Sequence, residues 1–226
     1  MLTYAPWGAA PGLRHGFLDR RACAGATRWE PVVAAAGVAL PVVTARQVHG
    51  TCAAVVTRAD APPGEADALV TTTAGLLLGV VTADCVPVLL IARGARAAAA
   101  VHAGWRGAAA GVLEAAVARL CAVAGSTPAA LEAVLGPAIG PCCYEVGPEV
   151  RAAFRARTGE LTASAFGAAG PRERLDLRAA CRQLLLAAGV PTVGVLGPCT
   201  RCDPRYCSYR RDGPGAGRQL SFIGWA

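Results

Sequence analysis

Residues 68–121 read ALVTTTAGLLLGVVTADCVPVLLIARGARAAAAVHAGWRGAAAGVLEAAVARLC. The predicted fold class rests mainly on this segment. Apolar runs of strand length predict strands over 68–73, 76–82, 86–92 and 97–101, with turns near Gly75 and at Arg93-Gly94. Residues 107–121 follow with apolar side chains at helical spacing. Strands and helices in this succession predict an α+β protein with mixed β-sheets.

The rest of the chain extends this pattern. Residues 42–56 predict strands on either side of a turn at His49-Gly50, and 131–135 and 193–196 predict two more strands. Helices are expected over 148–158 and over 176–188, the second with Asp176 as its cap and Gly189 at its end. No internal repeat and no long linker divides the sequence. We therefore expect residues 1–226 to form a single domain.

Composition limits the classes of function. The net charge is +7, and every positive side chain is arginine because the sequence contains no lysine and no asparagine. The arginines are scattered without one long cluster, so we expect no nucleic-acid partner. The absence of lysine excludes mechanisms that need a Schiff-base or P-loop lysine.

Membrane association is not expected either. The longest apolar stretch, 76–92, is interrupted by Asp84 and Pro87 and is too short for a membrane span. The N-terminus lacks the basic and apolar segments of a signal peptide. We therefore expect a cytoplasmic protein whose ten cysteines are reduced thiols.

Three short segments each place one good zinc ligand beside an apolar run. They are RQVHG at 46–50 with His49, TADCVP at 82–87 with Cys85, and VHAGWRG at 101–107 with His102. Each residue alone is more often a core or turn residue than a ligand. Together, two imidazoles and a thiolate would leave the fourth tetrahedral position open, as in catalytic zinc sites.

These segments also carry a family resemblance. The motifs are RQVHG (46–50), DALVT (67–71), TADCVP (82–87), VHAGWRG (101–107), LGPAIGPCCYEV (135–146) and SYRRDG (208–213). In combination they resemble the laccase-domain family, also called multicopper polyphenol oxidoreductases and now regarded as purine nucleoside phosphorylases. The likeness extends from about residue 40 to the C-terminus. The N-terminal region looks shortened relative to the family.

The resemblance implies a single α+β domain with mixed β-sheets packed between helices. It implies a zinc ion held by His49, Cys85 and His102. It also implies a phosphorylase acting on adenosine, inosine, guanosine and S-methyl-5′-thioadenosine, with adenosine deaminase activity. An open zinc site suits deamination because zinc lowers the pKa of a bound water. Asp84 is a candidate general base or partner of the ligands, although an Asp that caps a turn fits as well.

Phosphate and the purine base require further partners. Arg46, Arg106 and Arg210 are candidates for phosphate, each also readable as a solvated surface arginine. Gln47, Cys142 and Tyr144 are further candidates for the substrate site, with Tyr144 able to stack on a purine. A tight turn with one buried thiol is the plainer interpretation of Cys142-Cys143.

Another group of cysteines raises the question of a second metal. Cys199 and Cys202, with Cys207 nearby, resemble half of a structural zinc site. The sequence shows no matching second pair of the usual kind. One metal, zinc, is therefore the expectation.

Two other functions compete with the phosphorylase. A metal-free cysteine hydrolase, such as an amidase of muropeptide precursors, could use Cys85 as nucleophile and His102 as base. A copper-dependent polyphenol oxidase would follow from the older family name. Copper oxidases of the usual laccase type need many histidines, and the chain has three.

Overall fold

The computed structural model describes residues 1–169 and 172–226. Its strands are β1 (Leu13–Phe17), β2 (Val42–Val43), β3 (Ala53–Val55), β4 (Ala68–Thr71), β5 (Leu77–Thr82), β6 (Val86–Ala92), β7 (Ala97–Ala103), β8 (Leu131–Leu135), β9 (Glu145–Val146), β10 (Phe166–Ala169), β11 (Arg172–Leu175), β12 (Thr192–Val195) and β13 (Gln219–Trp225). Its α-helices are α1 (Glu30–Ala35), α2 (Trp105–Ala110), α3 (Val112–Ala124), α4 (Pro148–Thr158), α5 (Leu177–Ala187) and α6 (Tyr209–Asp212). The predicted α+β class with mixed sheets is confirmed.

The largest sheet is mixed and has the strand order β12-β8-β6-β7-β4-β3. Its central strands are buried on both faces, which explains their unbroken apolar runs. Along β6, Val88 and Leu90 face the core beneath the helices, whereas Leu89 and Ile91 face the opposite core. The two-residue alternation therefore supplies two hydrophobic cores from one strand.

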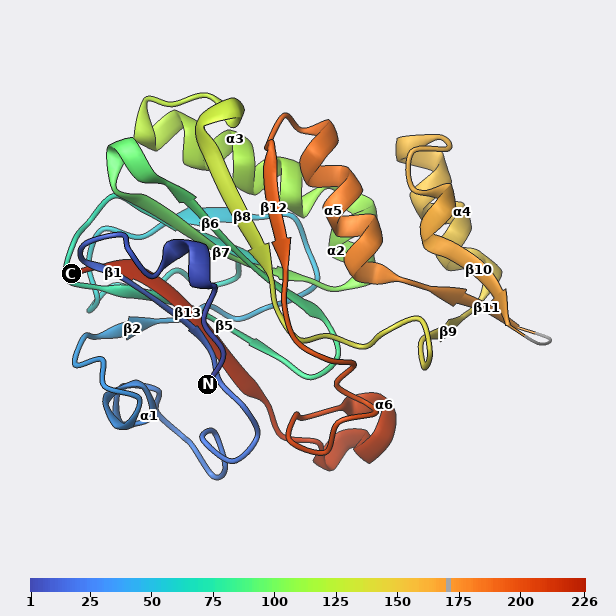
Figure 1. Ribbon diagram of the computed structural model, residues 1–226, viewed down its shortest axis with the longest axis horizontal. Coiled ribbons are helices and arrows are strands. Elements are labelled where there is room, and N and C mark those ends of the chain that lie inside the picture. Colours follow the sequence, from blue (N-terminus) through green and yellow to red (C-terminus); the bar gives the residue numbers. More distant parts are fainter. Residues whose placement is uncertain (170–171) are drawn as a thin grey trace.

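A second sheet, with the order β1-β13-β5-β2, packs against the large sheet. The molecule is thus layered, as Figure 1 shows: helices α3 and α5 cover one face of the large sheet, the second sheet covers the other, and α1 lies outside the second sheet. Trp7, Phe17, Leu89 and Trp225 belong to the core between the sheets. Val33 of α1 packs in a smaller core with residues of β5 and β13.

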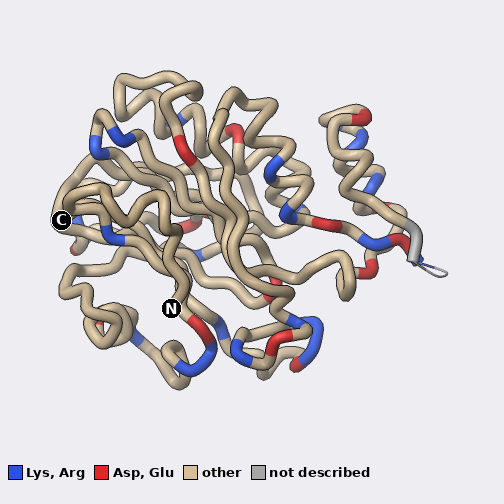
Figure 2. The backbone as a smooth tube through the Cα atoms, viewed as in Figure 1, with Lys and Arg blue, Asp and Glu red and all other residues tan. Residues whose placement is uncertain are grey.

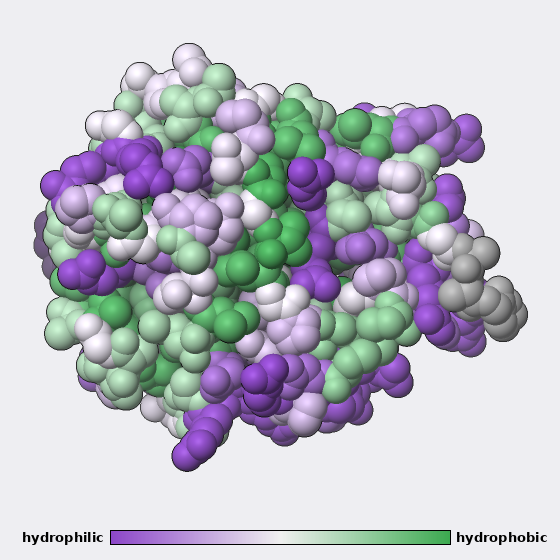
Figure 3. Space-filling model, in the orientation of Figure 1, coloured by the Kyte–Doolittle hydropathy of each residue, from purple (hydrophilic) through white to green (hydrophobic). Residues whose placement is uncertain are grey.

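A third, small sheet of β9, β10 and β11 extends away from the body together with α4 (Figure 1). Figure 2 shows charged positions along β11 and around α6, while the strands of the two large sheets are mostly uncharged. In Figure 3 an apolar strip crosses the face shown, over the edge strand β12, where Val195 is exposed.

Most elements lie close to their predicted places. The hairpin expected at Arg93-Gly94 forms between β6 and β7, which are antiparallel. Helices α4 and α5 match the prediction, and the Asp176 side chain accepts a hydrogen bond from the Ala179 N–H at 3.0 Å as the cap of α5. Residues 131–135 form β8 as predicted.

One expectation needs correction, and one pair of predicted strands is divided between two sheets. The helix predicted over 107–121 is two helices, α2 and α3, divided at Gly111, whose φ of 108° only glycine adopts readily. The runs 68–73 and 76–82 are both strands, but β4 and β5 belong to different sheets. Within the described residues, no helix is long and apolar enough to cross a membrane.

Candidate metal centre and substrate cavity

His49 lies in the segment between β2 and β3 and adopts a left-handed backbone conformation with a φ of 59°. Such a conformation is costly for a residue other than glycine and is found where the surroundings fix it. Gln47 helps to hold His49 in this conformation. Its side-chain N–H donates to the Val81 carbonyl at 2.7 Å, and its carbonyl accepts from the Val81 N–H at 2.8 Å. The amide thereby joins the His49 segment to β5.

Asp67 fixes the same segment from the other side. One of its carboxylate oxygens accepts from the His49 N–H at 3.0 Å, and the other from Val48 at 3.1 Å and Gly50 at 2.7 Å. The carboxylate also lies 2.7 Å from His102 Nδ1 and is buried. One side chain therefore orients two of the three predicted ligands, as carboxylates behind metal-bound histidines do.

The other two ligands come from neighbouring strand ends. Cys85 precedes β6 and follows Asp84, whose φ is 92°, and His102 lies near the end of β7 opposite Pro87. The rings of His49 and His102 meet edge to face with centroids 4.8 Å apart. Gly104 leaves room for this arrangement. A Cβ at Gly104 would lie 2.6 Å from His49 Cδ2 and 3.1 Å from Cys85 Sγ.

The three donor atoms fit a zinc ion. The ligand atoms of His49, Cys85 and His102 all lie within 4.8 Å of one another, and Cys85 Sγ is 3.8 Å from His49 Nε2. Tetrahedral zinc with ordinary zinc–sulfur and zinc–nitrogen bonds separates such a pair by about 3.6 Å. Two imidazoles and a thiolate also match the ligand types zinc prefers, and they leave one position for a fourth group.

Cys85 and His102 shift each other's pKa, so a cation would meet a thiolate that is already formed but would have to displace a proton from His102. Burial opposes ionisation of Cys85, but hydrogen bonds with His102 and His49 outweigh it and lower the pKa of the thiol to about 6. Burial would lower the pKa of His102, but Asp67 and Cys85 raise it to about 9. Without metal, the pair is therefore a thiolate beside an imidazolium at neutral pH.

A cavity of about 550 Å³ opens in front of this centre. Its volume falls in the range of small-molecule sites. Its lining comprises Gln47, His49, Val81, Thr82, Ala83, Asp84, Cys85, His102, Trp105, Arg106, Ile139, Tyr144, Tyr209, Arg210 and Arg218. The cavity therefore combines the three metal-ligand candidates with aromatic rings and three arginines.

The arginines of the cavity lack acidic partners. Among the described residues, no ion pair involves Arg106, Arg210 or Arg218. The Arg106 guanidinium lies over the Trp105 ring at 4.5 Å from its centroid, and that of Arg210 over Tyr144 at 5.1 Å. Three cations without acidic partners beside an open cavity are suited to an anion.

Asp84 lines the cavity beside Cys85, and both of its carboxylate oxygens accept hydrogen bonds from the cavity wall. One of its oxygens accepts from the Thr200 hydroxyl at 2.6 Å and the other from the Arg210 N–H at 2.7 Å. Its hydrogen bonds therefore hold the loop after β12 and the start of α6 at the cavity wall. The carboxylate that contacts a ligand is Asp67, which sequence reasoning missed because residues 67 and 102 are far apart in the chain.

The remaining predicted residues divide between the cavity and the surface. Gln47, Arg106, Tyr144 and Arg210 line the cavity. Arg46 points elsewhere and pairs with Glu65 on the surface. Cys142 lies in a group of cysteines outside the cavity lining.

Arg218 lines the cavity although no sequence signal singled it out. It lies beside Gly217, just before β13, and only the folding of the C-terminal strand into the second sheet carries it there.

A second hollow, of about 720 Å³, lies between α4 and the small sheet. It is larger, but its arginines are already paired with acidic residues: Arg151 with Glu173, Arg155 with Glu160 and Arg172 with Glu145. It contains none of the metal-ligand groups found in the described residues. The chemistry of the molecule is therefore concentrated in the cavity before His49, Cys85 and His102.

Comparisons with known proteins place this site in a family context. A purine nucleoside phosphorylase of Xylella fastidiosa strain Temecula1 is 44% identical over 192 residues, which cover 79% of this chain and 71% of that protein. Adenosine deaminase RL5, from an unknown prokaryotic organism, is 40% identical over 161 residues, covering 70% of this chain and 61% of that protein. These names describe the relatives.

The fold is shared with solved structures. YlmD from Geobacillus stearothermophilus superposes with a TM-score of 0.84 at 31% identity, covering 96% of this chain and 93% of that one. The Bacillus licheniformis protein YfiH gives a TM-score of 0.85 at 28% identity, covering 99% of this chain and all of that one. The family described as "Multi-copper polyphenol oxidoreductase laccase" matches residues 19–226, which confirms the resemblance inferred from the motifs. The chain therefore belongs to the multi-copper polyphenol oxidoreductase laccase family.

Proposed function

We propose that this protein is a zinc-dependent purine nucleoside phosphorylase with adenosine deaminase activity. It would convert adenosine, inosine, guanosine or S-methyl-5′-thioadenosine, together with phosphate, to the free base and the ribose 1-phosphate. The observation that carries the proposal is the open His49, Cys85 and His102 set at a cavity that also holds three arginines without acidic partners and three aromatic rings. The relatives named purine nucleoside phosphorylase and adenosine deaminase support it.

His49, Cys85 and His102 would hold the zinc. When bound, the ion supplies Lewis-acid polarisation of an oxygen in its open position and lowers the pKa of a water there. Asp67 keeps His102 in the tautomer that presents Nε2 to the centre, because Nδ1 is engaged with the carboxylate at 2.7 Å. The same carboxylate holds the His49 backbone in its left-handed conformation.

Phosphate would bind the arginines of the cavity. In phosphorolysis an oxygen of phosphate forms a bond to the anomeric carbon of the ribose, the bond from this carbon to the base breaks, and the base leaves with a proton. Arg106, Arg210 and Arg218 can neutralise the incoming anion and orient it. Asp84 contributes indirectly, since its hydrogen bond to the Arg210 N–H positions that residue at the cavity wall.

The base would lie against the aromatic side chains. Trp105, Tyr144 and Tyr209 line the same cavity, and purines stack on such rings without regard to their exocyclic groups. This tolerance suits an enzyme that accepts adenine, hypoxanthine and guanine nucleosides. Arg106 and Arg210 lie against Trp105 and Tyr144, so the rings also shape the anion site.

One observation favours a second candidate function. Cys85, His102 and Asp67 form a thiol–imidazole–carboxylate series in which the thiol pKa is lowered to about 6. This is the arrangement of a cysteine hydrolase, and an amidase of muropeptide precursors belongs to that class. The nearby His49 fits this function less well, because a hydrolase needs no second imidazole at the thiolate.

A copper-dependent polyphenol oxidase has weaker support. Of the three histidines, His15 lies on β1, where its Nε2 accepts from the Tyr4 N–H at 2.9 Å, and it does not line the cavity. Two histidines and one cysteine cannot supply a type-1 site together with a trinuclear cluster. Copper could still occupy the His49, Cys85 and His102 set in place of zinc.

The test is to incubate purified protein with adenosine, with and without phosphate, and to identify the products by chromatography. Adenine and ribose 1-phosphate that form only with phosphate are expected, together with a slower, phosphate-independent formation of inosine. Absence of both products, in protein shown to contain zinc, would overturn the proposal. Turnover of an amide substrate by metal-free protein would then favour the cysteine hydrolase.

A further inference from the structure

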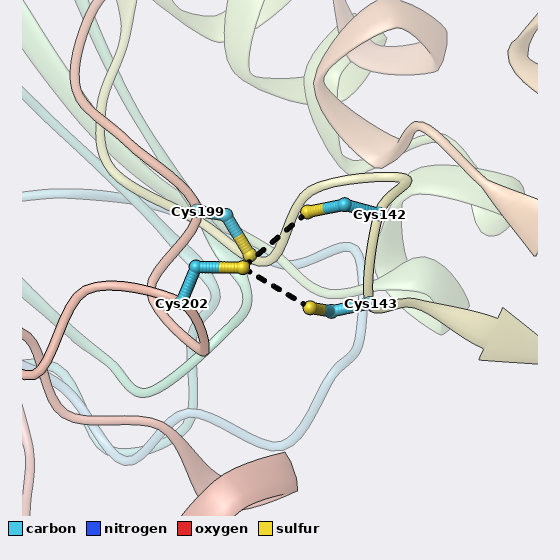
Figure 4. A group of neighbouring side chains, drawn as sticks. All are labelled: Cys142, Cys143, Cys199 and Cys202. Atoms are coloured by element: carbon cyan, nitrogen blue, oxygen red, sulfur yellow. Dashed lines mark hydrogen bonds between the residues drawn. The ribbon is translucent and has the colours of Figure 1, made fainter.

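Four cysteines outside the cavity lining bring their sulfur atoms together. Cys142, Cys143, Cys199 and Cys202 have Sγ atoms that all lie within 4.8 Å of one another. Figure 4 shows the four side chains pointing toward a common centre from two separate loops. The sequence indicated only half of such a site, Cys199 and Cys202, and the missing half is the adjacent pair Cys142-Cys143.

The spacing of the sulfurs matches a tetrahedral metal. Cys202 Sγ lies 3.6 Å from Cys142 Sγ and 3.3 Å from Cys143 Sγ. Four thiolates around zinc, each at the usual bond length, are about 3.8 Å apart. A set of four sulfurs in this geometry is typical of zinc or an iron–sulfur centre, and it contains no open position.

The two loops begin at the same end of two neighbouring strands of the large sheet. Strands β8 and β12 are parallel neighbours with Leu135 opposite Val195, so the segments that follow them begin side by side. A bridge between Ala138 and Cys199 continues the pairing, and the Thr200 N–H donates to the Ala138 carbonyl at 3.1 Å. The strand order of the sheet therefore dictates that these cysteines meet.

The surroundings of Cys199 favour a thiolate. The Gly140 N–H donates to Cys199 Sγ at 3.1 Å, a contact that stabilises a thiolate. Arg174 donates to the Cys142 carbonyl at 2.9 Å, which brings a cation close to the group. All four cysteines are free thiols, and their separations far exceed the roughly 2.05 Å of a disulfide.

From this geometry we propose that Cys142, Cys143, Cys199 and Cys202 form a second, structural zinc site in addition to the centre at His49, Cys85 and His102. Four cysteine thiolates hold the ion and release their protons as it binds. The site fastens the loop after β8 to the loop after β12. It is independent of the reaction proposed above and stands whether or not that function is correct.

The proposed structural zinc site affects the cavity because both loops contain residues that form or hold the cavity wall. The first loop contains Ile139 and ends at Tyr144, both of which line the cavity. The second contains Thr200, which donates to Asp84, and leads to Arg210. The four cysteines are thus positioning residues. Loss of the metal at these four cysteines should make this wall of the cavity more mobile and leave the His49, Cys85 and His102 set intact.

The test compares zinc content in full-length variants purified in reducing, metal-defined buffer. Wild type should contain two zinc ions per chain, and Cys142→Ser/Cys202→Ser should contain one. Cys85→Ala should also contain one, and the double variant combined with Cys85→Ala should contain none. Cys52→Ser, which alters an exposed side chain that belongs to neither group of metal-ligand candidates, is the matched control and should keep two. The double variant should also have a higher KM for nucleoside, with kcat less affected.

Cobalt substitution provides a measurement that does not depend on how the variants fold. The four-cysteine site supplies four thiolate ligands, and Cys85 supplies one at the other centre. Wild-type protein loaded with two cobalt ions should therefore show about five times the thiolate-to-cobalt absorption of a protein with cobalt at the Cys85 centre alone. A single zinc per chain in wild type, lost on Cys85→Ala, would overturn the proposal. A disulfide among the four cysteines in reduced, native protein, or iron in place of zinc, would contradict it equally.

Discussion

At the scale of single residues, Asp67 explains more of the metal centre than any ligand does. Its buried carboxylate contacts His102 and the backbone of three consecutive residues around His49. Burial would raise the pKa of Asp67, but the hydrogen bonds from His102, Gly50 and Val48 outweigh it and keep that pKa low. The negative charge is therefore permanent at neutral pH, and it increases the basicity of His102 toward a metal.

Replacing Asp67 tests this role. Asp67→Asn keeps the size of the side chain but removes the charge and turns an NH₂ group toward an N–H donor. We expect zinc affinity to fall by about 10–100-fold and the free energy of unfolding to fall by ~1–3 kcal/mol. Competition with a zinc chelator measures the first and chemical denaturation the second. Unchanged zinc affinity would rule out this role, and Asp60→Asn, at an exposed aspartate, is the control.

Arg218 lines the cavity, although the sequence did not reveal it. Its replacement tests whether phosphate binds by contact in the cavity or is attracted only by the positive charge of the surface. Arg218→Gln should raise KM for phosphate by about 10–100-fold, the loss expected for a charge-assisted hydrogen bond. KM for nucleoside should change little. Steady-state kinetics with phosphate as the varied substrate measures the effect.

Arg46→Gln is the matched control for this prediction, because Arg46 is an exposed arginine paired with Glu65 outside the cavity. It should leave KM for phosphate unchanged. Equal effects of both substitutions would show that long-range charge, and not contact in the cavity, determines phosphate binding.

Residue identities alone reached part of this site. Two histidines and a cysteine beside apolar runs indicated the ligands, because those residue types are rare in such settings. Asp67 and Arg218 could not be found in the same way. Asp67 stands in the DALVT motif, but nothing in that motif pairs its carboxylate with His102, which lies far away in the sequence. Arg218 reaches the cavity only through the fold, and no local pattern distinguishes it from a surface arginine.

At the scale of elements, the turn from β7 into α2 shapes the metal centre through the absence of a side chain. Gly104 has a φ of −72° and a ψ of 163°, values open to any residue, so its backbone does not require glycine. What requires glycine is space, since a Cβ there would meet His49 Cδ2 and Cys85 Sγ. The small residue before α2 thus lets three ligands from different elements converge.

Gly104→Ala should therefore damage metal binding more than stability. We expect zinc affinity to fall at least about 10-fold, because His49 has to move, whereas overpacking should cost at most ~1–3 kcal/mol of folding free energy. Zinc titration and thermal unfolding give the two values. Gly64→Ala, where an added Cβ meets nothing within 4 Å, is the control. A Gly104→Ala protein with normal zinc affinity would contradict the packing argument.

Strand β1 carries a pH-dependent contribution to stability through His15. Its ring lies against Trp7 and accepts from the Tyr4 N–H, and burial lowers its pKa below the ordinary 6.5. The unfolded chain consequently binds the proton first as pH falls. Stability from this residue is complete above about pH 6.5 and is lost as pH drops toward the lowered pKa.

The matching experiment measures urea unfolding of wild type and His15→Gln between about pH 7.5 and pH 5. Wild type should be the more stable at the upper end, because glutamine packs less well against Trp7. The difference between the two should shrink toward acid pH. A constant difference across the range would show that His15 does not titrate in this window.

Helices and strands were predictable where the signals that define them lie within their own stretch of sequence. The β6–β7 hairpin, α4 and α5 carry their own turn, cap and periodicity signals, and the structure confirms them. Sheet membership was not predictable. Strands β4 and β5 follow one another yet join different sheets, and β13 pairs with β1 and β5 from the far ends of the chain. Such pairings depend on long-range packing that single-sequence patterns do not record.

At the scale of the whole molecule, the layers bring distant segments to one site. His102 comes from β7 of the large sheet, Cys85 from the turn just before β6, and His49 from the segment between β2 and β3, while loops after β8 and β12 close the cavity wall. Arginines arrive from α2, α6 and the segment before β13. The fold thus assembles metal ligands, aromatic rings and cations that no continuous piece of sequence contains.

We propose that one metal, held by His49, Cys85 and His102, is required for cleavage of purine nucleosides by phosphate. The most direct measurement determines zinc content and phosphate-dependent release of adenine from adenosine on the same preparations of wild type, Cys85→Ala, His102→Ala and Cys52→Ser. We expect both ligand variants to stay folded by circular dichroism, to lose one equivalent of zinc and to lose turnover, while Cys52→Ser retains both the zinc and the turnover. Wild-type turnover in either ligand variant would contradict it.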